Sequence, residues 1–169
     1  LLNWRSTMVE VFSMSKSYNM PGWRIAFMAG NARMIAALSH LKTYMDYGTF
    51  MPLQYAAAWA LDHGDGLVDE IRSLYQTRAT TLTRGLAASG WGDVPEPSGS
   101  MFVWAKIPRK LAGKSSRDAA TWLIEEAHVA LSPGTRFGPG GVGFLRVALI
   151  EDPPRVQEAC ARIGKALAR

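Results

Sequence analysis

The most informative segment of the chain is Ser13-Met14-Ser15-Lys16-Ser17-Tyr18-Asn19-Met20-Pro21-Gly22-Trp23-Arg24. Apolar runs typical of strands precede and follow its polar part, over residues 8–12 and 23–29. Pro21 and Gly22 interrupt any regular element between the two runs. The segment therefore predicts a short loop in which the hydroxyls of Ser13 and Ser15 lie next to the Lys16 amine, with an arginine further on.

Lys16 has two possible interpretations at this point. It can be a nucleophile if its pKa falls from the usual ~10.4 toward neutrality, and a nearby arginine favours this by charge repulsion. Ser13, Ser15 and Arg24 together offer the hydrogen-bond donors that a phosphate dianion needs. The alternative is a surface turn with an ordinary solvated lysine, and the spacing alone leaves both open.

The rest of the chain alternates strands and helices. We expect strands at 100–107, 129–132 and 144–150, and helices at 31–44, 52–61, 67–88, 115–127 and 153–169. Asn31 is the expected cap of the first of these helices, and the glycine-rich residues 133–143 are expected to form a flexible loop. The pattern predicts an α/β protein with a boundary near Ala88, where an α/β layer gives way to a compact α+β lobe.

Composition excludes several classes of protein. The 169 residues are 48% hydrophobic and 20% charged, and the net charge of +5 is scattered, without the basic run of a nucleic-acid-binding arm. No window has the ~20 apolar residues of a membrane span, and the N-terminus lacks a secretory signal. The single cysteine, Cys160, predicts a reducing, cytoplasmic compartment. His40, His63 and His128 lack the spacing of metal ligands, so no metal site is expected.

Arg146 is the other candidate site residue. It lies in an apolar strand between Leu145 and Val147, so its side chain shares a face with Phe144 and Ala148. A charge on such a face needs a partner or an edge. The residues alone are compatible with an edge-strand arginine or with a ligand-binding one.

Residues 13–24 closely resemble the cofactor-lysine signature of the class I/II aminotransferases, which are pyridoxal-phosphate-dependent enzymes of fold type I. Further similar stretches are residues 44–50, 99–108, 132–134 and 144–149. Within the family, the chain looks most like the branch of alanine transaminases and LL-diaminopimelate aminotransferases. The resemblance implies that residues 1–88 are the C-terminal portion of the large cofactor-binding domain and 89–169 a small C-terminal domain.

The resemblance also implies a role for each candidate residue. Lys16 would bind pyridoxal 5'-phosphate covalently and then act as the base at the substrate Cα, while Ser13, Ser15 and Arg24 would bind the cofactor phosphate. Arg146 would bind the α-carboxylate of the substrate. Residues 47–49 match a family loop near the dimer interface that approaches the neighbouring active site.

The implied reaction is transamination between a small amino acid and a 2-oxo acid. Family members are about twice as long, and their N-terminal half carries further cofactor-binding groups. We therefore expect this chain alone to bind the cofactor poorly, to be inactive, and to associate as a homodimer or with the N-terminal half, without nucleic acid or membrane as partner. Two alternatives stay open: a lyase or decarboxylase of the same fold, and a non-catalytic, aminotransferase-like regulatory module.

Overall fold

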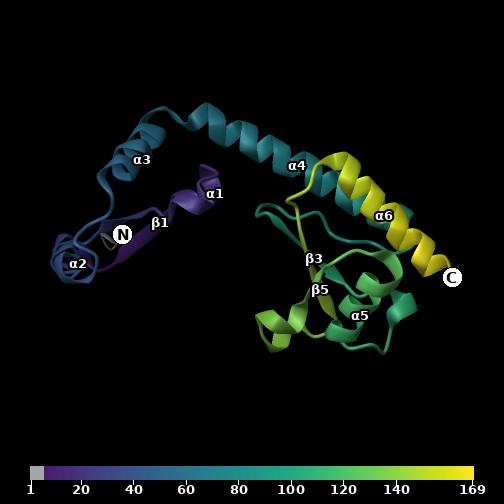
Figure 1. Cartoon of the computed structure of the whole chain (residues 1–169). Helices are drawn as coiled ribbons and strands as arrows, with labels where there is room; N and C mark the ends of the chain where they lie inside the picture. Colours follow the sequence, from purple (N-terminus) through teal and green to yellow (C-terminus); the bar gives the residue numbers. More distant parts are fainter. Residues whose placement is uncertain (1–5) are drawn as a thin grey trace. The chain divides into compact units, whose positions relative to one another are not determined.

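The structure is a computed structural model, and it describes residues 6–169. The chain divides between Arg72 and Ser73 into two compact units. The first unit contains β1 (Val9–Ser13), α1 (Met14–Ser17), the 3₁₀ turn Pro21–Trp23, β2 (Ala26–Gly30), α2 (Ala32–Met45) and α3 (Met51–His63) (Figure 1). Helix α4 (Asp65–Ala88) begins in the first unit and ends in the second.

The second unit contains three strands and two further α-helices. They are β3 (Phe102–Lys106), α5 (Ser116–Trp122) with its π-helical continuation Leu123–Ala127, β4 (Ser132–Pro133), β5 (Phe144–Ala148) and α6 (Pro153–Ala168). Three 3₁₀ turns accompany them, namely Arg109–Leu111, Gly134–Phe137 and Pro139–Gly141.

Strands β1 and β2 form an antiparallel hairpin. Its register runs from Val9 opposite Gly30 to Ser13 opposite Ala26. Gly30 has a φ of +138°, and a Cβ there would lie 2.5 Å from the carbonyl oxygen of Met8. Only glycine fits this conformation and this close approach, so it fixes where the hairpin ends.

A small core holds the loop of this hairpin against α3. Met14 and Ile25, at the two ends of the loop, are buried together with Ala57 and Ala60 of α3. The two alanines are three residues apart and share one face of the helix. Lys16 is exposed, so this core positions the loop without using the lysine side chain.

The second unit is built on an antiparallel sheet in the order β3-β5-β4. Val103 and Ala105 of β3, and Leu145 and Val147 of β5, are buried in the main core of the unit. Residues between them project to the opposite face, because side chains alternate along a strand. That opposite face carries Arg146 and is only partly covered.

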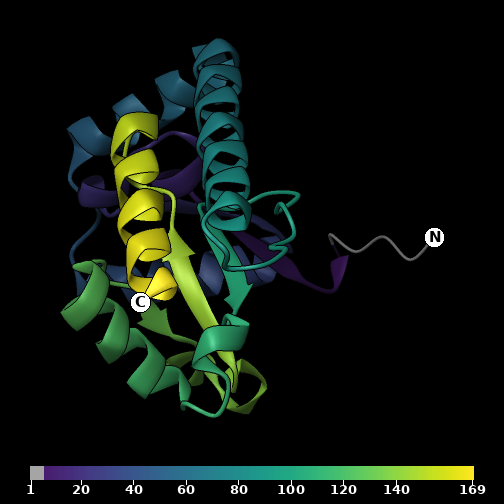
Figure 2. The same cartoon turned by 90° about the vertical axis from the view of Figure 1, so that its right-hand side faces the viewer.

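Helix α6 packs along the C-terminal part of α4, as Figure 2 shows. The approach is close because the contact residues are small: a Cβ added at Gly85 would lie 2.7 Å from Sγ of Cys160. Ser89 Oγ lies 2.7 Å from the carbonyl oxygens of both Gly85 and Cys160. Within the second unit, helices thus cover the buried face of the sheet, while the face of Arg146 is only partly covered.

Three expected elements are corrected. The strand expected from residue 23 begins only at Ala26, because a 3₁₀ turn ends at Trp23 and Arg24 has a left-handed backbone. The strand expected at 129–132 is reduced to Ser132–Pro133, because His128 has a left-handed backbone and the N–H of Val129 still bonds to the carbonyl oxygen of Leu123. The loop at 133–143, expected to be flexible, instead contains two 3₁₀ turns.

Other expectations are confirmed. Asn31 caps α2, and its Oδ1 accepts a hydrogen bond of 3.1 Å from the backbone N–H of Met34. Helices and sheets are mixed, as expected of the α/β class. The domain boundary near Ala88 stays a prediction. Within residues 6–169, no helix combines the length and the apolar character needed to cross a membrane.

Candidate functional site

The loop between β1 and β2 brings its two ends together. The backbone N–H of Met14 donates to the carbonyl oxygen of Ile25 at 3.2 Å, directly beyond the last strand pair. Ser13 and Ser15 flank one partner of this bond, and Arg24 precedes the other. The backbone therefore places three of the four predicted cofactor-binding residues at the same end of the hairpin.

Ser13 also caps the one-turn helix α1. Its Oγ accepts a hydrogen bond of 3.1 Å from the backbone N–H of Ser15, so its own hydroxyl hydrogen stays available to a ligand. Ser15 is buried and its hydroxyl bonds to no other described residue. Lys16 follows on α1 with an exposed side chain that pairs with no carboxylate among residues 6–169.

Arg24 has a backbone conformation that is unusual for arginine. Its φ and ψ of 53° and 47° lie in the left-handed region, which costs a non-glycine residue about 1 kcal/mol or more. Nη1 donates to the carbonyl oxygen of Pro21 at 2.9 Å, and the remaining guanidinium N–H groups have no partner in the described chain. A strained residue with free donors is typical of a ligand-binding position.

The donor set of the loop fits a phosphate group. The hydroxyls of Ser13 and Ser15, the Lys16 amine and the Arg24 guanidinium are possible donors, and residues 13–24 contain no carboxylate that would compete for them. Charge-assisted hydrogen bonds from such donors are the strong ones in phosphate recognition. The loop can therefore hold an anion and present an amine beside it.

Arg146 lies in the second unit, on the partly covered face of the sheet. Its strand neighbours are Trp104 of β3 and Ser132 of β4. Its guanidinium carbon lies 4.0 Å from the ring centroid of Phe102 and 4.0 Å from that of Phe137. The expected face is thus confirmed, and the partner that the charge requires is a pair of aromatic rings.

No carboxylate among residues 6–169 forms an ion pair with Arg146. The residue is half-buried, and its guanidinium N–H groups bond to no other residue of 6–169, so they have hydrogen bonds to offer an anion. Phe137 belongs to the residues 133–143 that were expected to be flexible, and the sequence signal for its position is weak. In the structure, the backbones of Gly134 and Gly141 lie too close together for a side chain at either position. These two glycines are the only feature of the sequence that fits an ordered turn there.

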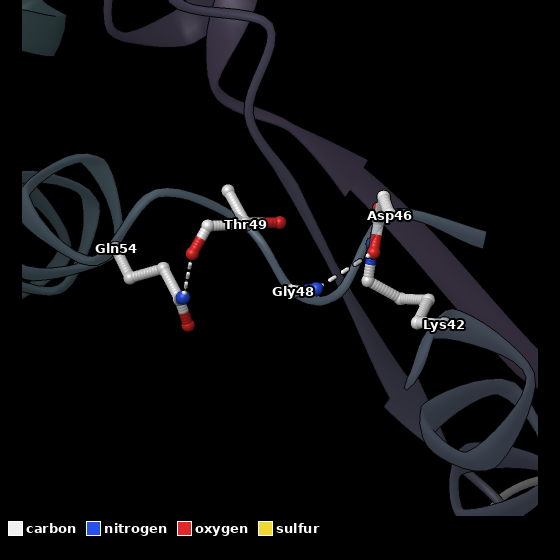
Figure 3. A network of polar contacts seen from close by, with 5 residues as sticks. All are labelled: Lys42, Asp46, Gly48, Thr49 and Gln54. Atoms are coloured by element: carbon white, nitrogen blue, oxygen red, sulfur yellow. Dashed lines mark hydrogen bonds and ion pairs between the residues drawn. The ribbon is translucent and has the colours of Figure 1, made fainter. Parts of the chain in front are cut away.

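A third element is the loop at residues 47–49, which joins α2 to α3 (Figure 3). Asp46 accepts hydrogen bonds from Lys42 Nζ and from the backbone N–H of Gly48, the latter at 3.0 Å. These two donors, Lys42 first, lower the pKa of the Asp46 carboxyl. Gln54 Nε2 donates to the carbonyl oxygen of Thr49 at 2.6 Å. Contacts from both helices therefore define the loop, while Tyr47 is 93% exposed.

Comparison with known proteins gives one consistent result. Residues 2–163 match the family model for aminotransferase class I and II. The chain is 47% identical over 155 residues to the glutamate-pyruvate aminotransferase AlaC of Escherichia coli (strain K12), a match that covers 92% of this chain and 37% of that protein. It is 40% identical over 156 residues to an LL-diaminopimelate aminotransferase of Oleidesulfovibrio alaskensis, covering 92% of this chain and 39% of the relative.

A solved structure agrees. An aminotransferase from Staphylococcus aureus superposes with a TM-score of 0.85 at 32% identity, over 99% of this chain and 43% of that one. The chain therefore spans between 37% and 43% of the length of these three relatives.

Proposed function

Because the chain belongs to the class I and II aminotransferases, we propose that a protein containing it transfers an amino group between an amino acid and a 2-oxo acid. The expected resemblance, the branch of alanine and LL-diaminopimelate aminotransferases, and fold type I are confirmed. Proteins of this family use pyridoxal phosphate, which supplies an electron sink for the carbanion formed at the substrate Cα. The use of this cofactor by the present chain is part of the proposal.

The observation that carries the proposal is the donor set of the hairpin loop. Ser13, Ser15 and Arg24 would bind the phosphate of the cofactor, since their free donors lie at one end of the hairpin. Lys16 would bind the cofactor through Nζ and, once released, take the proton from the substrate Cα. Its exposure on a one-turn helix leaves the amine free to do both.

Arg146 would bind the α-carboxylate of the substrate. Its half-buried guanidinium lacks an acidic partner in the described chain and can form the bidentate pair that suits a carboxylate. The relatives AlaC and LL-diaminopimelate aminotransferase support a small amino acid as the substrate, with glutamate and pyruvate as the first pair to test.

We also propose a homodimer, and a cytoplasmic location in keeping with the single cysteine. Seven large apolar side chains between residues 44 and 59 are more than half exposed, which is unusual for a surface facing water. They are Tyr44, Met45, Tyr47, Phe50, Met51, Tyr55 and Trp59. Their exposure supports association with a second copy or with an N-terminal half of the kind that the longer relatives have. Light scattering that finds a well-behaved monomer of this chain would contradict association.

A chimera tests the function. This chain replaces the matching segment of AlaC, so that the relative supplies the remaining part of the enzyme. We expect the absorbance of lysine-bound cofactor, its fixation on Lys16 by borohydride, and amino transfer from glutamate to pyruvate. Lys16→Ala should lower the rate about 10²–10⁴-fold, the range of a lost acid–base group, while the exposed control Lys110→Ala should not.

The same measurements on this chain alone should give little cofactor binding and no activity. Fixation of the cofactor on a different lysine in the chimera, or full activity of Lys16→Ala, would refute the assignment. Release of carbon dioxide without any need for a 2-oxo acid would favour the decarboxylase alternative. A folded chimera that binds no cofactor would favour the non-catalytic alternative.

A further inference from the structure

The guanidinium of Arg146 contacts two phenylalanine rings. Each ring centroid is 4.0 Å from Cζ of Arg146. Phe102 and Phe137 form no ring pair with each other in residues 6–169, so each ring contacts the guanidinium on its own. Two separate aromatic contacts therefore hold this one cation.

Both rings are held by the fold. Phe102 lies on β3, opposite Ala148 in the antiparallel register. Phe137 ends a 3₁₀ turn and contacts Trp104 edge-on, with ring centroids 5.9 Å apart. Trp104 in turn stacks on Phe144 at 5.7 Å. Trp104, Phe137 and Phe144 thus form an aromatic wall on the sheet face of Arg146, and this wall holds Phe137 in place against the guanidinium.

We propose that Phe102 and Phe137 are positioning residues that hold the Arg146 guanidinium in one plane for an incoming carboxylate. The inference rests on the proposed function, in which Arg146 binds the substrate. An arginine side chain has several rotatable bonds, and fixing its plane beforehand reduces the entropy lost on binding. The two rings restrict how the guanidinium can turn, while its N–H groups bond to no other residue of 6–169 and so remain as donors to a carboxylate in the guanidinium plane.

The test measures carboxylate binding at Arg146 directly. This chain is treated with phenylglyoxal, which modifies accessible guanidinium groups, in increasing concentrations of sodium propionate. Mass spectrometry of the peptides gives the propionate concentration that protects half of Arg146, with the exposed Arg117 as internal reference. A protection constant, unlike a modification rate, does not depend on how accessible the bare side chain is.

Leucine variants remove the π faces while keeping an apolar side chain. Phe137→Leu and Phe102→Leu should each raise the half-protecting concentration about two- to fivefold, within the ordering cost of one immobilised side chain. Phe137→Tyr and Phe102→Tyr should retain the value of the unchanged chain. Phe144→Leu is the matched control, because Phe144 lies on the same face and stacks on Trp104 without covering the guanidinium.

Three results would overturn the inference. Equal protection in both leucine variants and in the unchanged chain would refute it, while Arg146 would keep its role in the proposed function. Loss of protection in the Phe144→Leu control as well would show a general effect of the aromatic wall. Absence of any protection by propionate in the unchanged chain would refute a carboxylate site pre-organised by the two rings, whereas the chimera tests the proposed function separately. If one leucine variant fails to fold, the other gives an independent measurement.

Discussion

Gly85→Ala should destabilise the second unit, although alanine favours a helix. Two effects oppose each other at this position of α4. Replacing glycine by alanine inside a helix stabilises it by about 1 kcal/mol. The new Cβ, however, would lie 2.7 Å from Sγ and 3.1 Å from Cβ of Cys160, a buried residue of α6.

The clash should be the larger effect. Both distances are shorter than an ordinary van der Waals contact, and overpacking a tight interior costs about 1–3 kcal/mol. We therefore expect a net loss of about 1 kcal/mol in the free energy of unfolding, the difference between these two magnitudes. Gly66→Ala in the same helix is the control, because a Cβ there would meet nothing within 4 Å and should be neutral or stabilising.

Urea unfolding followed by circular dichroism measures both variants. The Cys160→Ala background adds a second test, since it removes the sulfur atom that the new methyl group meets. Gly85→Ala should then be nearly neutral, giving a coupling energy of about 1 kcal/mol between the two positions. If Gly85→Ala stabilises the chain as much as Gly66→Ala does, the reasoning about the α4–α6 contact is wrong.

Two further predictions concern the second unit. Burial raises the pKa of the Cys160 thiol; the unfolded chain therefore ionises first, and the free energy of unfolding should fall as the pH rises beyond about 8.5, the usual thiol value. Urea midpoints at neutral and alkaline pH check this, and the same fall in Cys160→Ala would assign it to other groups. Ser115→Ala should cost about 1 kcal/mol, because Ser115 Oγ accepts a hydrogen bond of 3.1 Å from the N–H of Asp118 at the start of α5. An unchanged urea midpoint would show that this cap is dispensable.

Local signals made much of the fold predictable. Asn31 and Ser115 are capping residues followed by helical patterns, and both helices begin where these residues place them. The strand ends were harder to predict, because an apolar run does not reveal a backbone conformation. Arg24 and His128 have left-handed backbones, so the strand after Arg24 begins later and the strand after His128 is shorter than expected. The residue types at these two positions do not predict this conformation.

The candidate site likewise has a part that local sequence predicts and a part that it does not. The serines and Lys16 are close in sequence, so a single motif predicted them together. The environment of Arg146 depends on Phe102 and Phe137, which lie 44 and nine residues away along the chain. Both rings contact Arg146 only because of the register of β3 with β5 and the ordered turn at Gly134–Phe137. No local sequence pattern predicts either of these features.

The left-handed backbone at Arg24 affects the choice of variant at this position. Alanine would delete the guanidinium yet keep a β-carbon in an unfavourable conformation, whereas glycine would delete it and relax the main chain. A loss of cofactor affinity common to both variants would measure the charge itself. The difference in the free energy of unfolding between the glycine and the alanine variant would measure the conformational strain of a non-glycine residue at this position.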